Sequence, residues 1–340
     1  MLNENENYET YNFECSPSYL VNNLTSTQKS LYFIHNSESL PRVLVANKEI
    51  LLDKNKSKNK CLTIFNSNET NEMIFIKSIT LKDSEYIAIG LYNGFKLWNT
   101  DGSRLLFQIS GANITPNKIY AFTCCCEFKM NESEENFADS LLTCDNYGQI
   151  FFVYGSKSNW HSKKNIYVTK NFESILSICS SIYNNHIGIS LDNGDVVILK
   201  LENEACEEKK TIESQHGQNI AVSSVIFSIK NKKEFFMAFG YITGEIKIIS
   251  INDYNIKFTI NSNLRSVGPM IVIKENEIVT GSDDGQLTIW KYDEDKNKII
   301  LRKNMVFEDK MIVGLVYNEE NQKLFVNSFD CPDIIIVHDI

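Results

Sequence analysis

The chain has 340 residues, of which 43% are hydrophobic and 23% are charged, an ordinary composition for a globular protein. Its net charge of -9, from 43 acidic and 34 basic residues, argues against general nucleic-acid binding, which depends on basic side chains that neutralise phosphates. No apolar run approaches the roughly 20 residues that a helix needs to cross a bilayer, so we expect no membrane segment.

The N-terminal part predicts strands but no clear repeat. The first residues, MLNENENYET, lack the basic start and apolar stretch of a secretory signal, which favours a cytoplasmic setting, with a nuclear one as alternative. Three strands are expected at LYFIH (31–35), RVLVA (42–46) and EILL (49–52), forming a degenerate first unit at about 15–66. The basic run at 53–60 is interpreted as a solvated loop.

Further along the chain, one hairpin pattern recurs. An apolar run, a short polar turn with glycine at its corner and a second apolar run are found five times, at 88–98, 141–154, 188–202, 237–250 and 280–292. The corner glycines, spaced 54, 46, 50 and 41 residues apart, are Gly94, Gly148, Gly194, Gly244 and Gly285. A sixth, degraded copy lies at 323–340, where Asp330 to Pro332 replace the glycine.

This period predicts the fold. A repeat of 41 to 54 residues suits one four-stranded blade, and seven units account for the chain at about 49 residues each. We therefore expect an all-β protein, one domain over 1–340 that forms a single seven-bladed β-propeller with four-stranded antiparallel blades. Residues 8–14 (YETYNFE) could be the outer strand of the last blade and close the ring.

Three segments fall outside the repeat. The acidic stretch 130–140 is interpreted as an insertion between the first two strands of its blade, with a docking loop as the alternative. The basic run at 230–234 is interpreted as another solvated loop. Trp160 lies in a polar segment, 155–165, and is either a partly exposed contact for a partner or a ring that folds back over the blade edge. The second interpretation is favoured.

The best copy, TGSDDGQLTIWKY (280–292), resembles the WD-repeat family. Asp284 occupies the family's turn aspartate position and Trp290 its tryptophan position; Trp98 ends the first hairpin in the same way. The turn position of the other copies holds Asn93, Tyr147, Asn193 and Thr243, and His216 could stand in for the family's histidine. The resemblance implies a WD40-like propeller whose blades would be pinned by hydrogen bonds among histidine, aspartate, Ser/Thr and tryptophan. No copy retains all four, so we expect apolar packing between blades to dominate.

Catalytic and metal motifs are absent from the sequence. There is no G-x-S-x-G, no phosphate-binding glycine loop and no H-E-x-x-H, the five histidines are scattered, and the nine cysteines show no C-x-x-C pair. The Asp-box of sialidase-type propellers fails on spacing in SDDGQLTIW, and NLRSVG and LPRVLV each offer one arginine where phosphoinositide-binding propellers use two. We expect no catalytic residue, metal or cofactor, and buried structural thiols at TCCCEF (123–128).

The functional expectation follows from the resemblance. It implies a non-enzymatic scaffold whose loop faces bind protein or peptide partners, as a monomeric propeller within a larger complex, without nucleic acid or membrane. The alternative is a propeller enzyme or small-ligand binder with a central-channel site built from dispersed residues. A polar central pocket with several inward carboxylates would favour that alternative, whereas a broad, partly apolar face would favour the scaffold.

Overall fold

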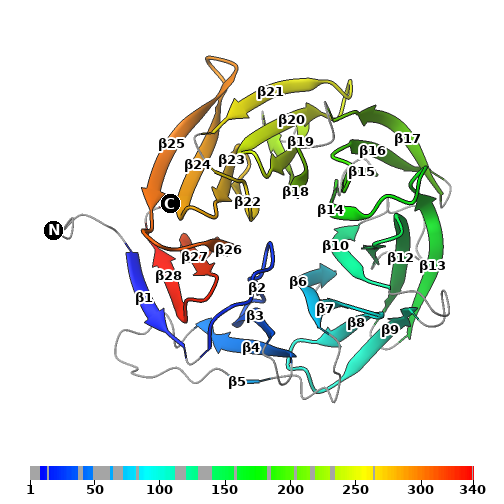
Figure 1. Ribbon diagram of the computed structural model, residues 1–340, viewed down its shortest axis with the longest axis horizontal. Helices are drawn as coiled ribbons and strands as arrows, with labels where there is room; N and C mark the ends of the chain where they lie inside the picture. The colour runs from blue at the N-terminus through cyan, green and yellow to red at the C-terminus, as the bar shows by residue number, and fades with distance from the viewer. Residues whose placement is uncertain are drawn as a thin grey trace.

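The chain forms a ring of seven four-stranded antiparallel sheets, which confirms the predicted all-β propeller (Figure 1). The structure, a computed structural model, describes residues 8–338 and 340 except 14, 37–40, 49–61, 64–71, 82–83, 112–119, 129–139, 157–158, 182–184, 203–204, 215–218, 230–233 and 263–264. Within these residues no helix has the length and apolar character needed to cross a bilayer.

The blades follow one another along the chain, and each runs from an inner strand at the ring axis to an outer strand at the rim. Blade 1 contains β2 (Thr25–Ser26), β3 (Ser30–Asn36), β4 (Pro41–Asn47) and β5 (Leu62–Thr63). Blade 2 contains β6 (Met73–Leu81), β7 (Ser84–Leu91), β8 (Gly94–Asn99) and β9 (Leu105–Ser110). Blade 3 contains β10 (Phe122–Phe128), β11 (Ser140–Asp145), β12 (Gln149–Ser156) and β13 (Asn159–Val168).

The second half of the ring is built in the same way. Blade 4 contains β14 (Ile175–Ser180), β15 (His186–Leu191), β16 (Val196–Glu202) and β17 (Ala205–Ile212). Blade 5 contains β18 (Ala221–Ile229), β19 (Glu234–Tyr241), β20 (Glu245–Ser250) and β21 (Ile256–Asn261). Blade 6 contains β22 (Met270–Lys274), β23 (Glu277–Gly281), β24 (Gln286–Asp293) and β25 (Lys298–Val306). Blade 7 contains β26 (Ile312–Asn318), β27 (Lys323–Ser328) and β28 (Asp333–Val337).

The fourth strand of blade 7 comes from the other end of the chain. β1 (Tyr8–Asn12) pairs antiparallel with β28, with Tyr8 opposite Val337 and Asn12 opposite Asp333. Figure 1 shows this blue strand lying along the red C-terminal blade. Because β1 covers β28, the ring is joined by backbone hydrogen bonds between the two ends of the chain.

The core is divided among the gaps between blades. Seven clusters of buried apolar side chains occur in the described residues, and each lies between two neighbouring sheets. One of them packs Phe33 and Leu44 of blade 1 against Phe325 and Ile336 of blade 7, across the ring closure. Both faces of each sheet are thus buried, which explains the near-continuous apolar runs such as VVIL and IKII.

The corner glycines adopt the conformation that the repeat requires, with one exception. Gly148, Gly194, Gly244 and Gly285 have φ between +72° and +91°, and each amide nitrogen donates to the carbonyl three residues earlier. The first corner differs, because the non-glycine residue Asn93 takes the positive φ of 66° while Gly94 begins β8. The corner of the sixth, degraded copy likewise has a non-glycine residue at positive φ, Asp330, with φ of 51°.

The turn at Asp284 is longer than its Asp-Gly pair suggests. The backbone nitrogen of Ser282 donates to Gln286 O at 3.0 Å, so the loop holds three residues, and only its last, Gly285, has positive φ. A two-residue loop would need positive φ at both Asp284 and Gly285. The three-residue form avoids placing an aspartate in the left-handed region.

One sequence interpretation outside the repeat changes, and others fall on residues that the structure does not describe. In the segment 155–165, expected to be a polar segment beyond the hairpin, residues 155–156 end β12 and residues 159–165 belong to β13, the outer strand of blade 3. In blade 1, the expected strand EILL lies outside the described residues, and the outer strand that is described is β5. The acidic stretch 130–140 lies between β10 and β11, the first two strands of blade 3, and of its residues the structure describes Ser140. Of the basic runs at 53–60 and 230–234, the structure describes Glu234.

Candidate functional site

One end of the ring collects two kinds of connection. In each antiparallel blade the inner strand begins, the second strand ends and the third begins at the same end. The corners between second and third strands and the loops that enter each blade therefore share one face, which we call the corner face. Hydrogen bonds join the two: Ile242 N donates to Ile220 O at 3.0 Å, and Phe329 N donates to Met311 O at 2.8 Å.

Large apolar side chains are exposed on the corner face. Five of the eight exposed large hydrophobic residues among those described lie in its loops: Tyr19, Tyr92, Phe172, Ile242 and Phe329. Phe172 is 64% exposed and Tyr19 is 59% exposed, and Tyr19 meets Phe329 edge-on with ring centroids 5.6 Å apart. The other three, Ile256, Leu301 and Val306, lie on outer strands at the rim. These five residues lie on loops of different blades around the ring, where aromatic and aliphatic side chains are available for contact with a protein partner.

The same face is acidic. Of the described residues in its loops, ten are acidic and three are basic. The acidic ones are Glu72, Glu173, Asp192, Asp195, Glu213, Asp283, Asp284, Glu308, Asp309 and Asp330, and the basic ones are Lys170, Arg265 and Lys310. A surface of this kind attracts basic segments over long range, since its charges add into one field.

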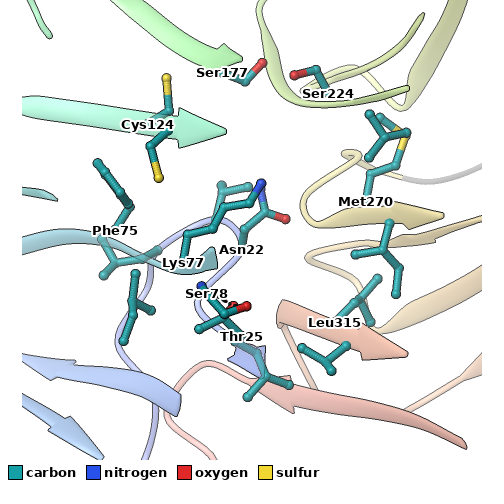
Figure 2. A pocket seen from close by; sticks show the side chains of 18 of the residues that line it. Asn22, Thr25, Phe75, Lys77, Ser78, Cys124, Ser177, Ser224, Met270 and Leu315 are labelled. Carbon is teal, nitrogen blue, oxygen red and sulfur yellow. Dashed lines mark hydrogen bonds between the residues drawn. The ribbon is translucent and has the colours of Figure 1, made fainter. Parts of the chain in front are cut away.

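The central channel is a second candidate. A cavity of about 650 Å³ is lined by the inner strands of all seven blades. Figure 2 shows Thr25 and Ser78 of blades 1 and 2 across the opening from Ser177 and Ser224 of blades 4 and 5. Tyr19 to Asn22, from the loop before β2, also line it.

The polar groups of the channel are mostly hydroxyl groups, and some of them are bound to other side chains. Thr25 Oγ1 donates to Ser78 Oγ at 2.8 Å, and Ser177 Oγ lies 2.7 Å from Ser190 Oγ. Among the lining residues that the structure describes, Lys77 is the one cation and Glu319 the one carboxylate. No group of His, Cys, Asp and Glu in the described part of the chain is arranged to hold a metal ion. The lining residues that the structure describes thus do not include the several inward carboxylates that would favour an enzyme of the dispersed-residue type.

The adjacent cysteines lie at the interfaces of blade 3. Cys125 packs against blade 2, Cys126 packs against blade 4, and Cys124 lines the channel. Burial raises the pKa of Cys126 to about 12 and raises that of Cys125 well above its usual value. These two groups are therefore neutral thiols near pH 7, which are poor nucleophiles.

The residues that match the WD pattern lie at corners and within third strands. Trp290 Nε1 donates to Thr280 Oγ1 at 3.1 Å, which joins β24 to β23. Asp284 accepts locally from Gln286, and Asn193 accepts from Asp195 N at 2.9 Å. Trp98 packs against the cluster between blades 1 and 2. His216 lies outside the described residues.

Trp160 is buried. It is 7% exposed and contacts Tyr86 of blade 2 edge-on, with ring centroids 5.3 Å apart. Its ring covers the edge between blades 2 and 3, so the expectation of an exposed partner contact does not fit its position. The sequence interpretation missed Phe172 and Phe329, although a large aromatic inside an otherwise polar turn, as in KNFES and SFDCP, is a signal that could have found them.

No family model matches the chain, and no curated protein matches it. Among solved structures, a chain of the crystal structure of a mitotic checkpoint complex is similar over 99% of this chain and 96% of its own, with a TM-score of 0.71 and 12% sequence identity. Because 1639 solved chains match in this way, and identity is this low, the likeness shows the fold and selects no partner.

Proposed function

We propose that this protein is a non-enzymatic scaffold that binds protein partners through its corner face. The observation that carries the proposal is the gathering of Tyr19, Tyr92, Phe172, Ile242 and Phe329 on that one face, within acidic loops. The partner that fits is a segment with apolar anchors flanked by basic residues, because both properties of the surface would then be matched. The rigid ring would hold such a segment without chemistry.

The family assignment is part of the proposal. The Trp290 to Thr280 hydrogen bond and the ring of seven blades support a divergent WD-repeat protein, and the small single-propeller WD repeat-containing protein 54 is the member whose arrangement and length it resembles. We further propose a monomeric propeller within a larger complex, in the cytoplasm.

The test is affinity purification of the tagged protein from its own cells, with cross-linking and mass spectrometry. The test variant carries Tyr92→Ser, Phe172→Ser and Phe329→Ser on the corner face. The matched control carries Ile256→Ser and Leu301→Ser, which are 42% and 55% exposed on the outer strands β21 and β25. Partners that cross-link to corner-face loops should be lost from the test variant and kept by the control.

Two results would contradict the proposal. One is recovery of the wild-type protein as a clean monomer under gentle conditions. The other is equal recovery of partners by the test and control variants, which would place the contacts elsewhere. Both variants should keep the melting temperature of the wild type within a few degrees, because exposed side chains contribute little to stability.

A further inference from the structure

A lysine and a cysteine lie in contact at blade 7, where the ring closes. Lys310 lies in the loop between β25 and β26, and Cys331 lies in the corner between β27 and β28. Lys310 Nζ is 2.7 Å from Cys331 Sγ. Cys331 is only 7% exposed, whereas the Lys310 side chain is 32% exposed, so the pair lies just beneath the corner face.

The distance between Lys310 Nζ and Cys331 Sγ is short for a nitrogen and a sulfur atom. Hydrogen bonds from nitrogen to oxygen have a most common length of about 2.9 to 3.0 Å. Sulfur is a larger atom than oxygen, yet the nitrogen and sulfur here are closer than that. Two atoms this close are within the span of one bridging atom bonded to both.

The surrounding backbone holds the two residues together. Lys310 N donates to Phe307 O at 3.2 Å, and the neighbouring residue accepts at 2.8 Å from the corner, where Phe329 N donates to Met311 O. Cys331 N donates to Ser328 O at 3.4 Å and closes the corner. Backbone hydrogen bonds thus hold in place the two loops that carry Lys310 and Cys331.

A carboxylate stands beside the pair and can accept its protons. Asp333 Oδ2 is 3.7 Å from Cys331 Sγ and 4.0 Å from Lys310 Nζ. Its other oxygen, Oδ1, accepts from Asn12 Nδ2 of β1 at 2.8 Å. Lys310, Cys331 and Asp333 therefore form a fixed group of amine, thiol and proton acceptor.

Lys310 presents a charged group to this cysteine. The hydrogen bond to Cys331 raises the pKa of Lys310, so its side chain is an ammonium group that donates to the sulfur. Cys126 and Cys179 instead lie in the apolar clusters between blades, where burial raises the pKa of each thiol to about 12.

We propose that hydrogen peroxide converts Lys310 and Cys331 into a covalent nitrogen–oxygen–sulfur bridge. One amine, one thiol and two peroxide molecules give the bridge and three waters. One N–H bond, the S–H bond and both peroxide O–O bonds break, and one N–O and one O–S bond form. Sulfur and nitrogen each lose two electrons, and the peroxide oxygens accept all four. The hydrogens of the broken N–H and S–H bonds end in the three waters, and the one further proton that the ammonium form of Lys310 carries passes to Asp333 and solvent. Two molecules of a dithiol return the four electrons and regenerate the amine, the thiol and one water.

The bridge would join the loop before β26 to the corner after β27 by a covalent bond. That corner carries Phe329, so oxidation would fix one of the exposed aromatic residues of the corner face. The inference stands on the geometry of the pair and does not depend on the proposed function.

The experiment uses the full chain, treated with hydrogen peroxide, digested with trypsin and examined by mass spectrometry. Free Lys310 is a cleavage site, whereas bridged Lys310 is not, so peptide 304–323 should appear joined to peptide 324–340. The joined species should be heavier than the two peptides by about 14 Da, from one oxygen gained and two hydrogens lost, and dithiothreitol should release both. Oxidation should also raise the melting temperature reversibly.

The variants separate the bridge from simple thiol oxidation. Lys310→Arg keeps the positive charge and the hydrogen-bond donor, so it should fold but give no joined peptide and no rise in melting temperature. Cys331→Ser should likewise give none, while the control Cys15→Ser should behave as the wild type. Sulfenic or sulfinic acid on Cys331 with normal cleavage at Lys310, or a joined peptide in Lys310→Arg, would overturn the proposal.

Discussion

Trp290 shows how one side-chain hydrogen bond joins two strands of a blade. Its indole nitrogen donates to Thr280 Oγ1 at 3.1 Å, and Thr280, a residue of β23, is fully buried. A donor left without its acceptor in such a place costs free energy, because water cannot replace the lost partner. This bond therefore fixes the indole ring against β23.

Replacing Thr280 by valine keeps the shape of the side chain and removes the acceptor. We expect Thr280→Val to lower the free energy of unfolding by about 1 to 2 kcal/mol, measured by urea denaturation. Thr10→Val, on the exposed side of β1, is the control and should change it by less than about 0.5 kcal/mol. Equal effects in the two variants would show that the Trp290 hydrogen bond contributes nothing.

Gly285 is a corner where an added side chain would meet the backbone of the neighbouring loop. Its φ is +82°, and a Cβ there would lie 2.1 Å from Phe307 O. Gly285→Ala should cost at least about 1 to 2 kcal/mol from the left-handed conformation alone, with the contact adding to it. The control is Gly268→Ala, where the nearest atoms lie 3.5 Å from the added Cβ and φ is not left-handed. If thermal unfolding ranks Gly268→Ala as the more damaging change, the account of the corner is wrong.

At the scale of elements, the hairpins could be predicted from the sequence because their signals are local. Apolar alternation and a corner glycine lie within about ten residues of each other, so a short stretch of sequence is enough to recognise each corner. The exceptions are instructive: Asn93 replaces glycine at positive φ, and β2 and β5 have only two residues each, too few to carry a pattern.

β1 is the element whose position depends on the whole ring. Deleting residues 1–12 would expose the edge of β28 and uncover part of the cluster that holds Ile334 and Ile336. We expect a lower melting temperature and concentration-dependent self-association in analytical ultracentrifugation, because an open edge pairs with other chains. Deleting only residues 1–7 keeps β1 and is the control. A monomeric 13–340 chain of unchanged stability would contradict the role of β1.

At the scale of the whole molecule, charge and shape act together on the corner face. The net charge of -9 is concentrated in part there, beside exposed aromatic residues. Long-range attraction between exposed charges weakens with salt, since the screening length falls from about 10 Å at 0.1 M to about 3 Å at 1 M. Partner binding at this face should therefore depend on salt.

We expect the affinity for the partner recovered by purification to fall as salt rises from about 0.1 M to about 1 M, measured by calorimetry. The variant Glu308→Gln with Asp309→Asn should weaken binding at low salt and flatten the salt dependence. The control is Glu294→Gln with Asp295→Asn, which removes the same charge from the loop between β24 and β25 on the opposite face. A salt dependence changed equally by both variants would show that net charge, not the corner face, is responsible.

The sequence by itself determined the blade repeat, the corner positions and the all-β ring, because period, turn chemistry and two-faced apolar strands are short-range properties of the chain. Only the tertiary structure decided the burial of Trp160 against Tyr86, the meeting of Lys310 with Cys331, and the gathering of Tyr19, Phe172 and Phe329 on one face. These residues are distant in sequence, and which of them meet depends on how the blades pack around the ring. A local sequence pattern therefore cannot predict these contacts.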